Sequence, residues 1–204
     1  MSKFLISLDC SYTRTGISIL NLEDKTFIFE TASEKIGEKQ FENVVKAAKS
    51  IVSQLKEIFY KYCENDFDLI MESPLPCSSM SPALYALDSL IYREFESHIK
   101  ATYNPRTLAS RIHGHKYSKT DSQDLAIKYL NILSKKMYTI LSVMGTKRKI
   151  CNDCAEAFLY CHLFLKDSGH KDFQFDNSEE IAAYKLRQKE LKKREKLLLS
   201  GKDE

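Results

Sequence analysis

The chain has 204 residues, of which 43% are hydrophobic and 11% aromatic, enough for one full-sized domain with a substantial core. Its formal net charge of +3 is too small to identify a nucleic-acid partner, so the distribution of the charges is more informative than their sum. No apolar run is long enough to cross a bilayer and no secretory signal is visible, so we expect a cytoplasmic protein that does not enter a membrane.

The first elements in chain order are three predicted strands. They cover residues 3–9, 16–20 and 26–30, and short polar turns join them, which is typical of an antiparallel meander. Apolar residues then recur at intervals of three and four over residues 40–62, which predicts an amphipathic helix.

The second half of the chain alternates strands and helices. Short strands are predicted at 67–71 and 101–103, and a helix begins at Ser81-Pro82, with serine as its cap and proline in its first turn. The remaining predictions are a basic polar loop at 106–120, an ambiguous segment at 137–145, and helices at 121–136 and 152–165.

This order predicts an α/β fold with a mixed sheet, in which the meander is antiparallel and later strands enter through helical crossovers. Residues 1–166 form the expected folded domain, and residues 167–204 form a charged, basic helical tail. The tail is either a solvated helix, a DNA-contacting arm or a dimer element.

Two apolar strands end on an acid. Asp9 follows the first strand and Glu72 follows the fourth, and in an open α/β sheet such strand ends lie at the ligand-binding edge. Asp153 and Glu156 are three residues apart in the first turn of a predicted helix, so they share one face. A buried carboxylate stays ionised only beside a cation, a metal or several hydrogen-bond donors.

Four converging carboxylates suit a hard cation such as Mg²⁺ or Mn²⁺. Two such ions can activate a water molecule and stabilise the leaving oxygen of a phosphodiester. The alternative is structural: Asp153 and Glu156 can be ordinary helix N-terminal acids, and Glu72 a solvated strand-end acid. The joint pattern favours the functional interpretation.

Four motifs in this order are similar to those of one family. They are LDCSYTRTG, DLIMESP, NPRTLASRIHGHKYSKTDSQ and NDCAEAFLYCH. Over residues 3–166 the sequence therefore resembles the RuvC-type Holliday junction resolvases of the ribonuclease H-like superfamily, whose compact divergent members are often phage-encoded. Each motif is weak alone, but four in order are fairly specific.

The resemblance implies a ribonuclease H-like mixed sheet and a homodimer that cuts opposing strands of branched DNA. It implies Asp9, Glu72, Asp153 and Glu156 as ligands of two Mg²⁺ ions, for which Mn²⁺ can substitute, and Lys119 as a cation near the scissile phosphate. One departure is Glu156, where the bacterial enzymes usually have aspartate. The tail has no counterpart in the resemblance.

Basic residues gather between the second and third acids, where they can neutralise phosphates without reading sequence, or form an ordinary solvated loop. Arg14, in the first turn, can contact phosphate or pair with Asp9. Tyr12 and Tyr117 are candidates for stacking on unpaired bases. The predicted DNA contacts are Arg14, Arg106, Arg111, Lys116 and Lys119, with His113 and His115 in the same basic segment.

Two further patterns have competing interpretations. Leu84, Leu87 and Ile91 are spaced for a dimer contact, but an ordinary core face has the same spacing. One helix also carries several potential zinc ligands. They are interpreted as buried structural thiols, with a zinc site as the alternative: Cys151, Cys154, Cys161 and His162.

The sequence therefore predicts a Mg²⁺-dependent endonuclease that resolves four-way and other branched DNA junctions. The alternatives are a related nuclease acting on flap DNA or RNA–DNA hybrids, and a non-catalytic branched-DNA-binding protein. LDCSYTRTG also resembles the first phosphate loop of actin-like and sugar-kinase-like ATPases, but we find no second loop of that kind.

Overall fold

The structure is a computed structural model of the whole chain. It describes residues 2–11, 13–35, 41–73, 82–114, 118–142 and 150–175, together with several positions between 178 and 190. None of the helices in these ranges is both long and apolar enough to cross a bilayer.

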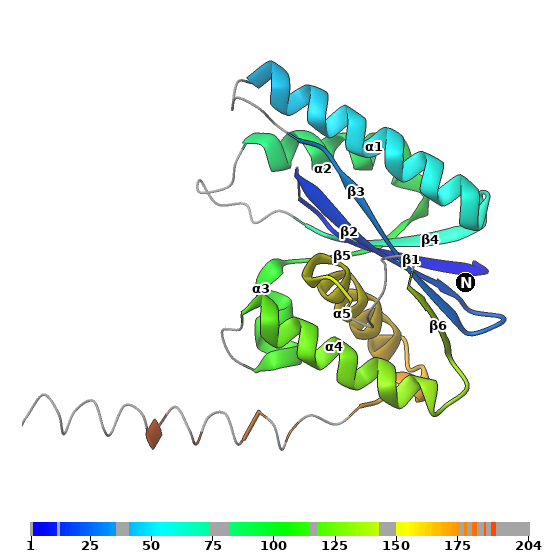
Figure 1. Cartoon of the computed structure of the whole chain (residues 1–204), viewed down its shortest axis with the longest axis vertical. Helices are drawn as coiled ribbons and strands as arrows, with labels where there is room; N and C mark the ends of the chain where they lie inside the picture. Colours follow the sequence, from blue (N-terminus) through cyan, green and yellow to red (C-terminus); the bar gives the residue numbers. More distant parts are fainter. Residues whose placement is uncertain are drawn as a thin grey trace, which may run out of the picture.

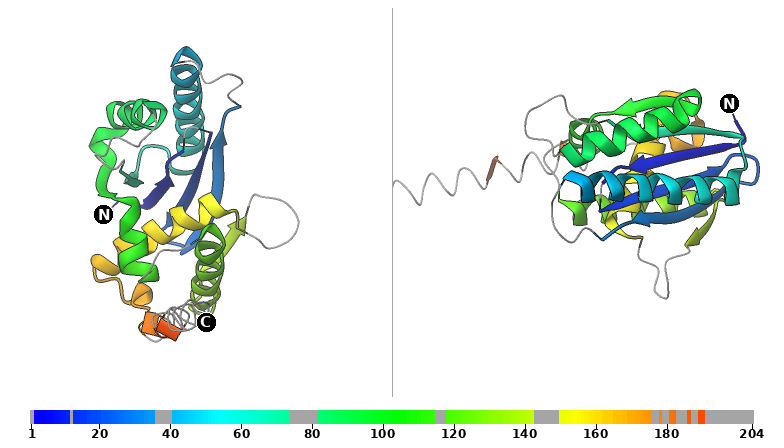
Figure 2. Two further views of the ribbon diagram at one scale, coloured as in Figure 1. Left: turned by 90° about the vertical axis from the view of Figure 1, so that its left-hand side faces the viewer. Right: turned by 90° about the horizontal axis from the view of Figure 1, so that it is seen from above.

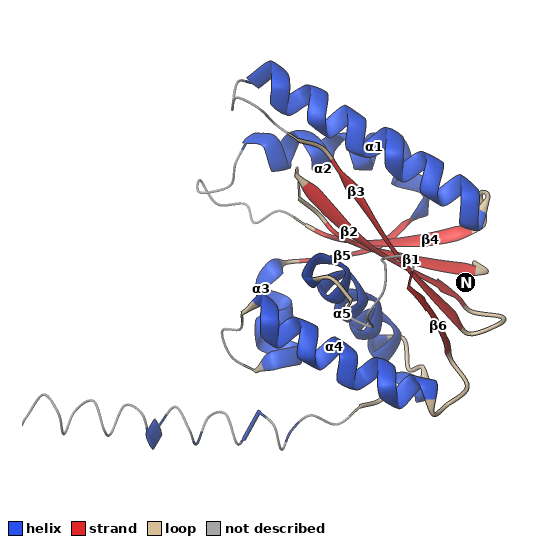
Figure 3. Ribbon diagram, in the orientation of Figure 1, coloured by secondary structure: helices blue, strands red, loops and turns tan. Residues whose placement is uncertain are grey.

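A six-stranded mixed sheet lies at the centre of the molecule, in the order β5-β4-β1-β2-β3-β6 (Figure 3). Its first three strands form the predicted antiparallel meander, β4 and β5 run parallel to β1, and β6 runs parallel to β3. The bounds are β1 (Phe4–Asp9), β2 (Arg14–Asn21), β3 (Thr26–Ser33), β4 (Phe67–Glu72), β5 (Ile99–Tyr103) and β6 (Thr139–Ser142).

Helices cover both faces of the sheet (Figures 1 and 2). The helices α1 (Phe41–Cys63) and α2 (Pro82–Phe95) pack side by side on one face, and α4 (Lys119–Ser134) and α5 (Asn152–Asp167) pack together on the other. Each face has its own apolar core, so the sheet separates two cores. The expected α/β arrangement is confirmed.

The apolar stripe of α1 and the inner face of α2 meet the same core. Ala48, Ile51 and Leu55 of α1 are fully buried there, as the spacing of three and four predicts. Leu87 and Ile91 of α2 are fully buried in the same cluster, so their spacing reflects core packing within the chain rather than a dimer contact.

Two segments differ from the sequence prediction. The segment expected as a polar loop begins helically, with a short α3 (Pro105–Thr107) and a π-helical turn η2 (Leu108–His113). Asn104 caps it by accepting a hydrogen bond from the backbone of Arg106 at 2.8 Å, while Leu108 and Ile112 are buried beside α5. Part of the ambiguous segment forms β6 at the sheet edge.

The chain stays packed beyond α5. Phe173, in a short 3₁₀ turn η3 (Lys171–Phe173), is fully buried, and Phe175 is 8% exposed. Their rings lie against His162 of α5 and close one end of the core between α4 and α5. The packed core therefore continues past residue 166, the expected end of the folded domain.

Candidate active site

The ends of β1 and β4 place two acids on the α5 side of the sheet. The two strands are parallel and pair Leu8 with Met71, so Asp9 and Glu72 lie at the same edge. Side chains alternate between the faces of a strand. Ser7, two residues before Asp9, donates to the carbonyl of Ala157 in α5 at 2.7 Å, so Asp9 is on the α5 face.

Close contact between β2 and α5 brings the second pair of acids to this edge. Gly16 lies opposite Asp9 in the β1–β2 ladder, and a Cβ atom there would lie 2.2 Å from the backbone of Asp153. Only a residue without a side chain permits this approach. The first turn of α5, which carries Asp153 and Glu156, is therefore held against the strand that pairs with Asp9.

Asp9 is buried and Glu72 is half-buried, and the two share a hydrogen bond between their carboxyl groups. Burial, followed by the charge of Glu72, raises the pKa of Asp9 well above its usual range. Burial also raises the pKa of Glu72 to about 7, although its hydrogen bond with Asp9 and the charge of Lys119 oppose the increase. Both shifts favour the protonated forms, so the pair holds a proton more tightly than two solvated carboxyls would.

Glu156 belongs to the same electrostatic cluster. Burial and then the charge of Asp9 raise its pKa to about 7, against the charge of Lys119 and a hydrogen bond from Ser122. Three acids on two strands and one helix thus disfavour one another's charge. The charge of Lys119 opposes all three shifts but does not outweigh the effect of burial.

Asp153 is the acid that is already neutralised. Its Oδ1 accepts a hydrogen bond from Lys119 Nζ at 2.8 Å, and its Oδ2 lies 3.3 Å from Arg14 Nε. The bond with Asp153 also raises the pKa of Lys119. Arg14 therefore pairs with Asp153 rather than with Asp9, and the five predicted catalytic residues converge on one edge.

The other predicted DNA contacts differ in their surroundings. Arg106 is exposed just after β5. Arg111 donates from both terminal nitrogens to the carboxylate of Asp167, with Nη1 at 2.9 Å from Oδ2, which commits its side chain to an ion pair. Outside the described residues lie Lys116, His115, Tyr12 and Tyr117.

Two residues near the acids, Ser122 and Asp88, were missed by the sequence analysis, which named His113 only as part of the basic segment. Ser122 of α4 donates to Glu156 Oε1 at 3.3 Å, and His113 lies behind Ser122. Asp88 of α2 has an Oδ1 that is buried without a hydrogen-bond partner among the described residues, and burial raises its pKa to about 6. Ser122 could have been predicted, because it lies three residues after Lys119 and so shares its helix face. No sequence pattern pointed to a role for His113 or Asp88 at this site.

The acids at this edge are the right kind of ligand for a hard cation, but their side chains are not at present arranged around a single point. Among the described residues, no three His, Cys, Asp or Glu side chains are grouped so that they can hold a metal ion. Asp153 faces Lys119 and Arg14, while Asp9 and Glu72 face each other. The chemistry of the donors still fits Mg²⁺, because all are carboxylate oxygens, and burial followed by the charge of neighbouring carboxylates raises the pKa values of three of them.

The cysteines of α5 do not assemble with His162. Cys151 caps the helix, where its sulfur accepts from the backbone nitrogen of Cys154 at 3.4 Å. Cys161 is fully buried, and His162 stacks on Phe175. The described cysteines are all free thiols, four of them buried, so the expectation of buried thiols describes Cys154 and Cys161.

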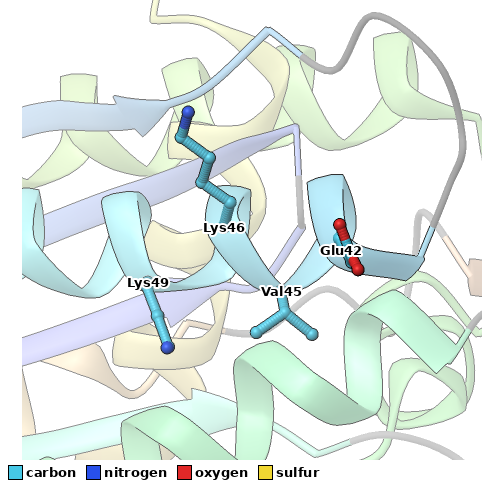
Figure 4. Close-up of a pocket in the computed structure, with 4 residues that line it drawn as sticks. All are labelled: Glu42, Val45, Lys46 and Lys49. Atoms are coloured by element: carbon cyan, nitrogen blue, oxygen red, sulfur yellow. The ribbon is translucent and has the colours of Figure 1, made fainter.

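A hollow of about 320 Å³ lies on α1, away from the acids (Figure 4). Glu42, Val45, Lys46 and Lys49 line it. The two lysine side chains point away from each other in Figure 4, so the hollow does not concentrate positive charge at one point.

Comparison with known proteins gives no match in sequence but clear matches in structure. No protein-family model matches the chain, and no curated protein matches it. The structure of RuvC from Thermus thermophilus has a TM-score of 0.51 at 14% identity, over 81% of this chain and 96% of that chain. T. thermophilus RuvC in complex with Holliday junction substrate gives 0.50 at 14% identity, over 82% and 96%.

The fowlpox virus Holliday junction resolvase is also similar, with a TM-score of 0.44 at 17% identity, over 80% of this chain and 99% of that chain. At these identities the match to T. thermophilus RuvC establishes the fold alone. The chain has the ribonuclease H-like fold of RuvC, as the four motifs predicted.

Proposed function

We propose that this protein is a metal-dependent endonuclease that cuts four-way and other branched DNA junctions. The observation that carries the proposal is the convergence of Asp9, Glu72 and Glu156 on one sheet edge, with pKa values raised by burial and mutual repulsion. Perturbed carboxylates grouped in this way mark a functional site more often than a structural one.

The residues that would hold Mg²⁺ are Asp9, Glu72, Asp153 and Glu156. Bound there, the metal would supply a water nucleophile and stabilisation of the leaving oxygen of a phosphodiester. Asp9 and Glu72 would act as ligands in their ionised forms, and Asp153 would exchange part of its pairing with Lys119 and Arg14 for the ion. Two ions, with Mn²⁺ able to replace Mg²⁺, suit this number of carboxylates.

Lys119 and Arg14 then have a second role as phosphate ligands. Both lie beside Asp153, and both side chains are substantially exposed, at 61% and 41%. A cation freed from Asp153 can neutralise a backbone phosphate at the reacting strand. The exposed Arg106 is a further candidate phosphate contact, and Lys116 stays a candidate from the sequence alone, whereas Arg111 would contribute only after leaving Asp167.

Branched DNA is the substrate we favour, because the fold matches T. thermophilus RuvC, whose structure was determined in complex with Holliday junction substrate. Symmetric cutting of two opposing strands requires two active sites. We therefore propose that the protein acts as a homodimer.

The decisive experiment uses an immobile four-way DNA junction with a linear duplex control, each with Mg²⁺ or EDTA. Paired symmetric nicks on the junction alone, absent with EDTA and with Asp9→Asn, are the expected result. The Asp9→Asn protein should still bind the junction.

Other outcomes would select the alternatives. Cutting of flap DNA or RNA–DNA hybrid instead of the junction would keep the metal site but change the substrate. Tight junction binding without cleavage by the native protein, at any Mg²⁺ or Mn²⁺ concentration, would contradict the nuclease proposal and favour a non-catalytic branched-DNA-binding protein.

A further inference from the structure

The first turns of α4 and α5 face each other with matched spacing. Lys119 and Ser122 are three residues apart on α4, as Asp153 and Glu156 are on α5, so each pair lies on one helix face. Lys119 bonds to Asp153 at 2.8 Å, and Ser122 bonds to Glu156 at 3.3 Å. Each acid of α5 thus has its own partner on α4.

Ser122 is held at a fixed position by its surroundings. It is fully buried in α4, and the helix begins at a capping box in which Ser118 and Asp121 bond to each other's backbone. This box fixes the first turn of α4 just before Ser122. A buried hydroxyl in a fixed turn can orient a flexible glutamate side chain.

His113 completes the arrangement behind Ser122. It is 6% exposed at the end of η2, and its Nε2 lies 3.4 Å from Ser122 Oγ. A serine hydroxyl has one proton, which Ser122 donates to Glu156, so Ser122 must accept from His113. With Ser122 donating to Glu156, this contact is a hydrogen bond when the imidazole carries its hydrogen on Nε2.

We propose that Ser122, oriented by His113, is a positioning residue that holds the Glu156 carboxylate toward Asp9. The proposal rests on the function proposed above, since it assigns a role within the same metal site. A hydrogen bond to the free carboxylate limits its rotation before any metal arrives. Partners of metal-ligating groups typically change metal affinity or activity by about 10- to 100-fold when removed.

Ser7 offers a matched control. Like Ser122 it is fully buried and donates its hydroxyl proton to α5, but its acceptor is the backbone carbonyl of Ala157, next to Glu156. Ser7→Ala and Ser122→Ala therefore remove equivalent atoms at the same depth. Only Ser122→Ala removes a bond to the carboxylate.

The first measurement is the χ1 rotamer of Glu156 in the metal-free protein, from NMR scalar couplings. One rotamer is expected in the native protein and in Ser7→Ala, and rotamer averaging in Ser122→Ala. An unchanged single rotamer in Ser122→Ala would overturn the proposal. Because this measurement needs neither metal nor DNA, it holds even if the proposed nuclease function fails.

The second measurement is Mn²⁺ binding followed by electron paramagnetic resonance, with junction cleavage alongside. Ser122→Ala should weaken Mn²⁺ binding about 10-fold and lower kcat about 10- to 100-fold, with KM for the junction unchanged. Equal losses in Ser7→Ala would contradict the proposal, because both variants would then act through helix packing.

Variants of His113 test the orienting bond. His113→Gln keeps an N–H donor near the position of Nε2 and should preserve the Glu156 rotamer. His113→Leu removes the donor and should allow the Glu156 side chain to average over several rotamers. If both variants behave like the native protein, His113 does not orient Ser122, and that part of the proposal fails.

Discussion

The two ends of α5 bury ionisable groups with opposite consequences. At its first turn, Glu156 faces Asp9 and Glu72, and all three carboxyls have raised pKa values. Toward its other end, burial lowers the pKa of His162 to about 3, and its Nδ1 has no hydrogen-bond partner among the described residues. Both ends disfavour charge, but only one end gathers several charges of the same sign.

The difference lies in how the unfavourable burial of each group is relieved. His162 lies among the rings of Tyr129, Phe173 and Phe175, where a neutral imidazole packs as one more aromatic group. The acids have no such neutral packing role, because their crowding persists in the folded protein and is relieved by protons or by a cation. A helix can therefore stabilise the core at one end and hold an electrostatically unfavourable site at the other.

Replacement of Asp9 is expected to have the largest effect on activity. Asp9→Asn removes a proposed metal ligand and should lower junction cleavage at least about 1000-fold, equivalent to several kcal/mol of lost transition-state stabilisation. The same variant should be more stable than the native protein at pH 8 without metal, because it removes a charge beside Glu72. Thermal unfolding and a cleavage assay measure the two effects. An Asp9→Asn protein that is both inactive and less stable would contradict the crowding argument.

The close approach of β2 to α5 predicts a severe effect of a single methyl group. Gly16→Ala places a Cβ against the backbone of Asp153 and should cost about 3 kcal/mol of unfolding free energy. Gly169→Ala is the control, since its Cβ would meet nothing within 4 Å and only the positive φ of 78° opposes it. We expect about 1 kcal/mol there. Urea unfolding of both variants compares them, and equal losses would show that the contact with Asp153 is unimportant.

Lys119 should matter more for activity than for stability. Its pair with Asp153 is largely exposed on the lysine side, so Lys119→Met should change the unfolding free energy by less than about 1 kcal/mol. Junction cleavage should fall about 100-fold if Lys119 neutralises phosphate and the developing charge. Steady-state kinetics at low and high salt measure the loss. A variant with native cleavage would remove Lys119 from the site.

The two ends of α5 should respond in opposite directions to pH, by up to a few kcal/mol each, since one pKa unit corresponds to about 1.4 kcal/mol. Glu72 and Glu156 have folded pKa values of about 7, above the ordinary 4.5, so the folded state binds their protons more tightly. Their contribution to stability is complete below pH 4.5 and is lost as pH rises through 7. Mg²⁺ should therefore raise the Tm more at pH 8 than at pH 5.

His162 should act in the other direction. Its pKa is lower in the folded state, about 3 against the ordinary 6.5, so the unfolded chain binds the proton more tightly between these values. Its contribution is complete above pH 6.5 and is lost as pH falls toward 3. His162→Phe should remove this acid sensitivity and leave the response above pH 6.5 unchanged. Thermal unfolding from pH 4 to 8 tests both ends, and an unaltered acid limb in His162→Phe would contradict the assignment.

Most of the secondary structure was predictable because local pattern determines it. The meander, α1 and the start of α5 follow from alternation, from spacings of three and four, and from caps that act within a few residues. The segment at Pro105–His113 was not predicted, because its polar surface conceals the two residues that pack inward, Leu108 and Ile112. Strand β6 was ambiguous because its pairing with β3 is remote in sequence.

The sequence by itself placed the four acids at strand ends and in a helix turn, and its resemblance to the RuvC-type resolvases implied Lys119 as a cation near them. These follow from local periodicity and from motif order. Only the tertiary structure decided which groups touch: Arg14 pairs with Asp153, Arg111 with Asp167, and Ser122 with Glu156. The reason is physical, because such pairings depend on how closely α5 packs on β2 and on which face α4 presents, and no local spacing encodes either distance.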